Sequence, residues 1–187
     1  MIISISGASG AGKSTVISNL TSTQGRFRRL TSITTRPPRD DDVSGEVDAV
    51  SEREFEKLLE DEKLAWSVMI YGHRYGSLKS EFVDAIHDPS SVLLCDIASD
   101  AVPKIRTIIE SSGSSQSRYV STYLMSPSMD ELGRRLADRG MDREEIKRRL
   151  VDHDVAERRE LLSGMYDLFI HSRLPTNKAC SVINSLT

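Results

Sequence analysis

Cysteine is scarce in this chain, which holds only Cys95 and Cys180 among its 187 residues. Two cysteines so far apart match neither a metal-binding spacing nor a redox pair, so the sequence offers no cysteine-based centre. Cys95 lies in an apolar run and is interpreted as a buried thiol. A buried free thiol is consistent with a reducing compartment, and we expect a cytoplasmic protein.

Long apolar runs are missing as well, and none approaches the length of a membrane span. Met1 leads directly into an apolar, strand-like segment, so we expect no signal peptide and no membrane partner. The net charge is −3 and the pI about 5.8, which argues against a nucleic-acid polymer as the partner. The four histidines show no ligand spacing, and no Ser/His/Asp constellation for covalent catalysis is present.

The sequence does contain a glycine-rich segment near its start, Gly7-Ala8-Ser9-Gly10-Ala11-Gly12-Lys13-Ser14-Thr15. This segment fits the pattern G-x-x-x-x-G-K-[ST] of phosphate-binding loops. It follows the β-branched segment 2–6, which is typical of a buried parallel strand, and precedes residues 15–20, which can begin a helix. We therefore predict that ATP phosphates bind at Ser9, Gly10, Ala11, Gly12, Lys13, Ser14 and Thr15.

The residue types of this loop suit the chemistry of a triphosphate. Glycines let successive backbone N–H groups point inward, and the following helix adds the positive end of its dipole. Lys13 supplies a mobile positive charge for the β- and γ-phosphates, and the Ser14 hydroxyl is a candidate ligand of Mg²⁺. The alternative is an ordinary glycine turn before a helix.

Strand-like and helix-like segments alternate along the rest of the chain. We expect strands at 64–71, 91–96, 119–125 and 167–171, and helices near 52–59, 78–86, 102–109, 128–140, 143–163 and 176–186. Residues 72–77 are interpreted as a turn. The alternation predicts one α/β domain with a parallel sheet. Asp96 ends an apolar strand and is a candidate metal ligand, although many buried strands end in Asp.

Two arginine-containing segments are candidates for binding phosphate. Arg36-Pro37-Pro38-Arg39 is stiff and extended, and it can present two guanidinium groups to a phosphate; the alternative is a solvated basic loop. Residues 134–149 hold many arginines with interleaved acids. They form either a mobile lid over the transferring phosphates or a solvated helical hairpin with i,i+4 pairs such as Glu145 with Arg149.

Taken together, these segments resemble the guanylate kinase-like family of nucleoside monophosphate kinases over nearly the whole chain. The resemblance rests on the phosphate loop, Ser32 with Thr34-Thr35-Arg36-Pro37-Pro38-Arg39, Gly45-Glu46, Ser51 before Glu54-Phe55, Tyr75-Gly76-Ser77, Asp96-Ile97, and Arg135-Leu136, Arg139-Gly140 and Arg148-Arg149-Leu150. It implies a three-layer P-loop fold with a central parallel sheet. The core would be 1–35 and 78–187, the acceptor-binding insert about 36–77, and the lid about 135–149.

The resemblance also implies roles for single residues. Arg36, Arg39 and Tyr75 would hold the phosphate of the acceptor monophosphate, and Ser32 and Ser77 would contact its base. Lys13 would act in catalysis with the lid residues Arg139 and Arg149, and Ser14 and Asp96 would hold Mg²⁺. The implied activity is phosphoryl transfer from ATP to a nucleoside monophosphate, with GMP as the first expectation.

The chain departs from the family pattern in the acceptor site. The family's tyrosine after the arginine pair is missing, since Val47 or Asp48 stands there. The two acids that read guanine fall on Ala65 or Trp66 and on Ala98. A guanine edge without acceptors would lose much of its selectivity. Two alternatives therefore stay open: a sugar phosphate kinase of the ribose bisphosphate type, and a non-catalytic module that binds phosphopeptides.

Overall fold

The central layer of the protein is a parallel sheet of five strands. The computed structural model describes residues 1–39, 42, 45–113, 119–171 and 173–187. The strands are β1 (Ile2–Ser6), β2 (Phe27–Arg29), β7 (Val92–Asp96), β8 (Tyr119–Met125) and β9 (Leu168–His171), in the order β2-β7-β1-β8-β9. Every neighbouring pair is parallel, which confirms the predicted α/β fold with its central parallel sheet.

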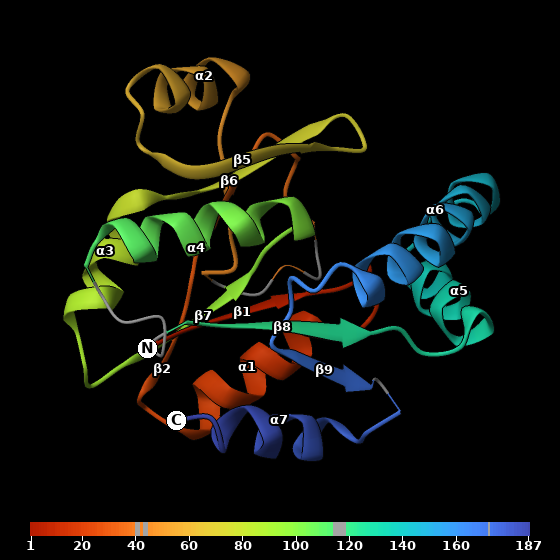
Figure 1. The fold of residues 1–187 in the computed structure, drawn as a ribbon. Coiled ribbons are helices and arrows are strands. Elements are labelled where there is room, and N and C mark those ends of the chain that lie inside the picture. Colours follow the sequence, from red (N-terminus) through yellow and green to blue (C-terminus); the bar gives the residue numbers. More distant parts are fainter. Residues whose placement is uncertain (40–41, 43–44, 114–118, 172) are drawn as a thin grey trace.

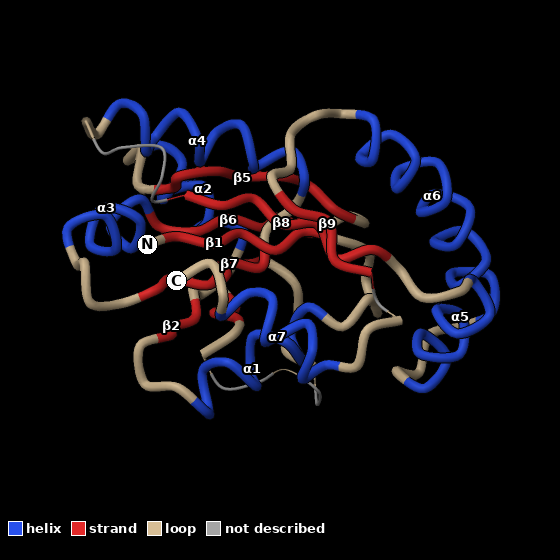
Figure 2. The backbone as a smooth tube through the Cα atoms, turned by 60° about the horizontal axis from the view of Figure 1, so that its bottom comes forward, coloured by secondary structure: helices blue, strands red, loops and turns tan. Residues whose placement is uncertain are grey.

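Helices cover both faces of this sheet (Figures 1 and 2). The helices α1 (Lys13–Thr23) and α7 (Thr176–Asn184) lie on one face, and α3 (Lys79–His87) and α4 (Val102–Ser111) lie on the other. The side chains of β1 divide accordingly, because Ile3 and Ile5 pack towards α1 and α7 whereas Ile2 packs towards α3 and α4. Burial on both faces explains why β7 is almost wholly apolar and why every residue of β1, its two serines included, is buried.

A second, smaller sheet lies beside the first. Its strands are β3 (Ser32–Thr34), β4 (Val47–Ala49), β5 (Leu64–Ile70) and β6 (His73–Leu78), in the order β4-β3-β6-β5. The helix α2 (Glu52–Glu60) packs on it through a small core of Ile33, Phe55 and Leu64. The predicted start of α2 is confirmed, because Ser51 and Glu54 form a complete capping box.

The interpretation of residues 72–77 as a turn was wrong. Only Tyr71 and Gly72 turn the chain, and β6 follows at once as the antiparallel partner of β5. Gly76 is a strand residue whose missing side chain serves close packing, since a Cβ atom there would lie 2.7 Å from the carbonyl oxygen of Trp66. The short strands β2 and β4 carry too little periodicity to be predicted from three residues each.

Two further helices, α5 (Met129–Asp138) and α6 (Arg143–Leu162), project beyond the carboxyl ends of the central strands (Figure 1). Both were expected within a few residues. The N-cap of α6 is Asp142, whose carboxylate accepts from the backbone N–H groups of Glu144 and Glu145. Of the helices in the described part of the chain, none has the length and apolar character that crossing a bilayer requires.

Candidate functional site

A cleft of about 710 Å³ opens at the carboxyl ends of the central strands, between the glycine loop, the second sheet and α6. Most of the predicted site residues line it, although they come from distant parts of the sequence. These are Ser9, Gly10, Gly12, Lys13, Ser14, Thr15, Ser32, Arg36, Arg39, Tyr75, Asp96, Arg139 and Arg149. Ala11 and Ser77 are buried behind the cleft wall and do not line it.

The glycine loop has the conformation that its sequence predicts. Gly7, Gly10 and Gly12 all have positive φ angles, of 146°, 87° and 106°. At Gly7 a side chain is excluded by space too, because a Cβ atom would lie 2.4 Å from the carbonyl oxygen of Leu124. Arg135 of α5 donates to the carbonyl oxygen of Gly10 at 3.0 Å, which ties the loop to the arginine-rich hairpin.

Lys13 lies at the first turn of α1, and its ammonium group folds back over the loop. Nζ donates to the carbonyl oxygens of Gly7 and Ala8 at 2.9 and 3.0 Å, and it lies 3.8 Å from Oδ1 of Asp96. Burial raises the pKa of Asp96, and the charge of Lys13 opposes that shift. The loop lysine and the strand-end carboxylate thus form a compact charged pair beneath the cleft.

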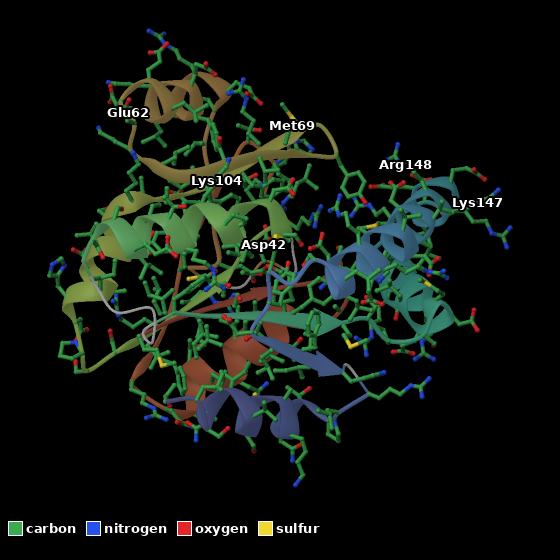
Figure 3. The ribbon with its side chains drawn as sticks, viewed as in Figure 1. Asp42, Glu62, Met69, Lys104, Lys147 and Arg148 are labelled. Carbon is green, nitrogen blue, oxygen red and sulfur yellow. The ribbon has the colours of Figure 1, made fainter. Side chains whose placement is uncertain are left out.

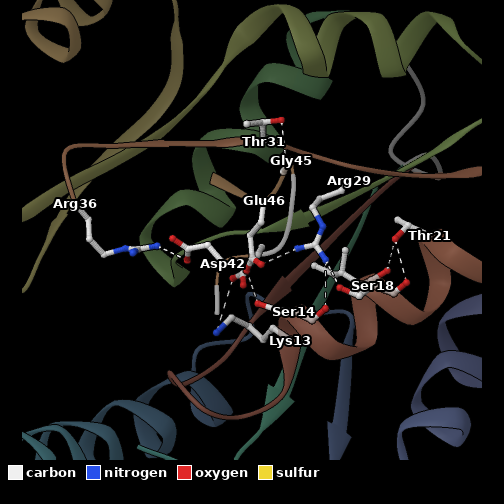
Figure 4. A network of polar contacts seen from close by, with 12 residues as sticks. Lys13, Ser14, Ser18, Thr21, Arg29, Thr31, Arg36, Asp42, Gly45 and Glu46 are labelled. Carbon is white, nitrogen blue, oxygen red and sulfur yellow. Dashed lines mark hydrogen bonds and ion pairs between the residues drawn. The ribbon is translucent and has the colours of Figure 1, made fainter. Parts of the chain in front are cut away.

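Glu46 connects the second sheet to the glycine loop (Figure 4). Its carboxylate accepts a hydrogen bond from Oγ of Ser14 and lies 3.5 Å from Nη1 of Arg29. Arg29, at the end of β2, also donates to Oγ of Ser18 at 2.7 Å. The hydroxyl predicted to bind a metal is therefore held by an acid that directly precedes β4 of the second sheet.

The arginine pair of the Pro-Pro segment is divided between two environments. Arg36 is buried, and its Nη2 lies 2.7 Å from Oδ1 of Asp42 (Figure 4). Arg39 is exposed, and its backbone N–H donates to Oδ2 of Asp42 at 2.7 Å. Burial acts to raise the pKa of Asp42, but the bonds from Arg36 and Arg39 outweigh it and lower the pKa overall. The guanidinium group of Arg36, which was predicted to hold the acceptor phosphate, is thus paired with an ionised carboxylate.

The arginine-rich hairpin combines the two interpretations that the sequence left open. Arg149 is only 8% exposed and forms the expected i,i+4 ion pair with Glu145, yet it also lines the cleft. Its guanidinium carbon lies 4.1 Å from the ring centroid of Tyr71, which belongs to the β5–β6 turn. Arg139 is exposed, forms the C-cap of α5 and also lines the cleft.

The wall near the end of β7 lacks carboxylates where the family pattern has them. Of the two residues at the first such position, Trp66 lines the cleft and Ala65 does not; Ala98 lines it at the second. Trp66 lies opposite Ser77 in the β5–β6 pair. The indole Nε1 of Trp66 and the hydroxyl of Ser77 are buried without a hydrogen-bond partner among the described residues. This part of the wall therefore carries an indole and an alanine instead of anions, and the Ser77 hydroxyl lies buried behind it.

Several cleft residues escaped the sequence analysis. Arg29, Asp42 and Tyr71 were assigned no role, and Glu46 was noted only within the Gly45-Glu46 motif of the resemblance. Their places depend on which strands pair, and that pairing has no local signal. Asp40 and Asp41, which precede Asp42, lie outside the described residues. Within the described part of the chain, no three His, Cys, Asp or Glu residues are grouped closely enough to hold a metal by themselves.

Comparison with known proteins agrees with this geometry. The guanylate kinase family model matches residues 1–183. The guanylate kinase of Neisseria gonorrhoeae is 34% identical over 160 residues, covering 83% of this chain and 74% of that protein. The guanylate kinase of Baumannia cicadellinicola is 33% identical over 162 residues, with 84% and 76% covered.

A solved structure supports the same assignment at the level of the fold. The crystal structure of guanylate kinase from Anaplasma phagocytophilum superimposes with a TM-score of 0.73 at 21% identity, covering 100% of this chain and 83% of that one. The family model, which matches residues 1–183, spans the loop, the second sheet and the arginine-rich hairpin alike, and the two relatives are more than 30% identical over more than four fifths of the chain. The chain therefore belongs to the guanylate kinase family, whose members are nucleoside monophosphate kinases.

Proposed function

We propose that this protein transfers the γ-phosphoryl group of ATP to a nucleoside monophosphate, with GMP as the first acceptor to test. The observation that carries this proposal is the composition of the cleft. Lys13 of the glycine loop, Arg36 of the segment that follows β3 and Arg149 of α6 line one cavity, although they come from three separate regions of the chain. Three cations around one space suit two phosphate chains meeting end to end.

The donor side would bind the ATP phosphates through the glycine loop. Residues Ser9 to Thr15 supply backbone N–H groups at the N-terminus of α1, and Lys13 supplies the mobile positive charge. Ser14 and Asp96 carry hard oxygen donors, which fit Mg²⁺ because that ion needs only one or two protein ligands. When bound, Mg²⁺ supplies charge neutralisation, and Glu46 would have to release the Ser14 hydroxyl.

The acceptor side would hold a monophosphate through Arg36, Arg39 and Tyr75, and we assign this role to the insert of about 36–77. The acceptor phosphate is already an anionic nucleophile at neutral pH, so no general base is required. Catalysis would consist of positioning and charge stabilisation. Arg139 and Arg149, in the proposed lid of about 135–149, would add two positive charges around the phosphates when the cleft closes.

The base side supports only weak selection of guanine. Guanine presents N1–H and amino donors, and these need acceptors for strong discrimination. Trp66 and Ala98 provide none, while Ser32 and Ser77 can donate or accept. The same wall favours, as a second candidate, an acceptor without a base, such as a ribose phosphate.

An ADP-release assay tests the proposal directly, with ATP, Mg²⁺ and a panel of ribo- and deoxyribonucleoside monophosphates and ribose phosphates. We expect turnover with at least one nucleoside monophosphate. Turnover of a ribose phosphate alone would replace the proposal with the sugar phosphate kinase. Calorimetric ATP binding without turnover of any acceptor would favour a non-catalytic module.

A further inference from the structure

The tip of the β5–β6 hairpin is a tight two-residue turn with an unusual residue in it. Ile70 and His73 are the last paired residues, and Tyr71 and Gly72 between them have φ angles of 48° and 81°. Such turns require left-handed backbone at both positions and favour asparagine or glycine there. A tyrosine in this conformation costs backbone energy that those residues avoid, so its side chain is a candidate for a specific role.

The ring of Tyr71 contacts the helix on the opposite side of the cleft. Its centroid lies 4.1 Å from the guanidinium carbon of Arg149 and 5.7 Å from that of Arg148. Figure 3 shows Met69 near the tip of the hairpin and Arg148 on the neighbouring part of α6. The two cations belong to α6 and the ring to the second sheet, so this contact bridges the acceptor-binding insert and the lid proposed above.

The contact joins a ring that is 44% exposed to a guanidinium that is buried. Arg149 is 8% exposed, and a guanidinium removed from water gains more from a ring face than an exposed one. Burial raises the pKa of Tyr71, with Arg149 opposing it, so the ring remains a neutral phenol at neutral pH. The second partner of Arg149 is Glu145, one helical turn before it on the same helix.

These two partners do not satisfy the whole guanidinium group. Nε of Arg149 is buried and has no hydrogen-bond partner among the described residues. The same side chain lines the cleft that holds Lys13 and Arg36. A long side chain fixed by a ring on one side and a carboxylate on another loses little further freedom when an anion arrives.

We propose that Tyr71 is a positioning residue that orients Arg149 and joins the acceptor-binding insert to the lid, so that both close on the phosphates together. This inference rests on the proposed function of Arg149 as a lid residue. It assigns Tyr71 no contact with substrate. Without the ring, Arg149 would keep its charge and Glu145 but lose its orientation, so the rate should fall more than the affinity for either substrate.

The test is a kinetic double-mutant cycle with ATP, Mg²⁺ and the best acceptor of the panel. Tyr71→Ala should lower kcat about tenfold with KM values changed less than threefold, as loss of a partly buried cation–π contact implies. Tyr71→Phe keeps the ring and should restore at least half of kcat. Met69→Ala, which removes an exposed side chain on the same hairpin, should behave like the wild type. In an Arg149→Ala background, Tyr71→Ala should cause no further loss.

The outcomes separate this inference from the proposed function. A normal kcat in Tyr71→Ala, or equal losses with and without Arg149, would overturn the positioning role while leaving the activity intact. An unchanged kcat in Arg149→Ala would overturn both the lid role and the positioning role. Thermal unfolding tests the contact without substrate. The fall in Tm of the double variant should be smaller than the sum of the falls in the two single variants. A fall equal to that sum would contradict the contact.

Discussion

The two sides of the cleft are built in different ways. The proposed donor side is one continuous segment, Gly7 to Thr15, which follows a strand buried on both faces, and Arg135 and Lys13 fix its carbonyl groups. The proposed acceptor side is assembled from β3, β5, β6 and the residues after β3, and the Arg36 guanidinium is paired there with Asp42. A site made by one continuous segment can be recognised as a sequence motif. A site assembled from paired strands can change its specificity while its fold stays the same.

The largest expected effect is on the donor side. Lys13→Ala removes the only side-chain cation of the loop, so turnover with every acceptor should fall by at least about 10³ with the fold intact. Steady-state ADP release and thermal unfolding would measure the two properties. Lys178→Ala, an exposed lysine on α7, is the matched control. A folded Lys13→Ala protein with near-normal turnover would show that the donor side lies elsewhere.

The lid arginines come next. Arg139→Ala and Arg149→Ala should each lower kcat about a hundredfold, since a cation that meets charge only in the closed state stabilises the transition state more than the ground state. Arg158→Ala serves as control, because that arginine lies on α6 but is 76% exposed and pairs with Asp154. If both lid variants kept a normal kcat, the arginine-rich segment would be a solvated hairpin and no more.

Substitutions on the acceptor side should change binding instead of rate. Arg36→Ala and Arg39→Ala should raise the acceptor KM about 10- to 100-fold, as the loss of a charge-assisted hydrogen bond implies, and leave ATP binding nearly unaltered. Initial rates at varied acceptor, with ATP affinity from calorimetry, would separate the two. Arg53→Ala on α2 is an exposed control. A defect confined to ATP affinity would reverse the assignment of the two sides.

The smallest expected effect concerns Asp42, the acid that forms an ion pair with Arg36. Asp42→Asn should lower the acceptor KM about two- to fivefold, because the incoming phosphate no longer displaces an ionised carboxylate.

The lowered pKa of Asp42 stabilises the fold above about pH 4, the unfolded pKa, and this contribution disappears as pH falls through the folded pKa. The difference in Tm between the wild type and Asp42→Asn should become smaller below pH 4. Asp61→Asn is an exposed control, and a raised KM in Asp42→Asn would mean that Asp42 supports binding.

The sequence predicted the local structure of the glycine loop well because its information is local. The apolar segment 2–6, the glycines and Lys13 all lie within thirteen residues, and the strand, the loop and the helix start lie where they were expected. The central sheet followed from alternating apolar segments. The capping box at Ser51 likewise needs only four neighbouring residues.

The acceptor side was harder to predict because its contacts are distant in sequence. Glu46 contacts Ser14, 32 positions earlier in the chain, and Tyr71 of the β5–β6 turn contacts Arg149 of the much later helix α6. Gly72 and Gly76 made β6 look like a turn, although only the first of them turns the chain. The choice between Ala65 and Trp66 depended on a register shift between Leu64 and Trp66, which no local pattern indicates.

The central claim is that the acceptor side keeps its phosphate-binding groups but has lost the anions that read guanine. The most direct test is the ratio of kcat/KM for GMP to that for AMP in the wild-type protein, at saturating ATP and Mg²⁺. With Trp66 and Ala98 in the wall, we predict a preference for GMP within about a hundredfold. A preference above about a thousandfold would contradict the claim, because it would require guanine to be read by other groups in the cleft.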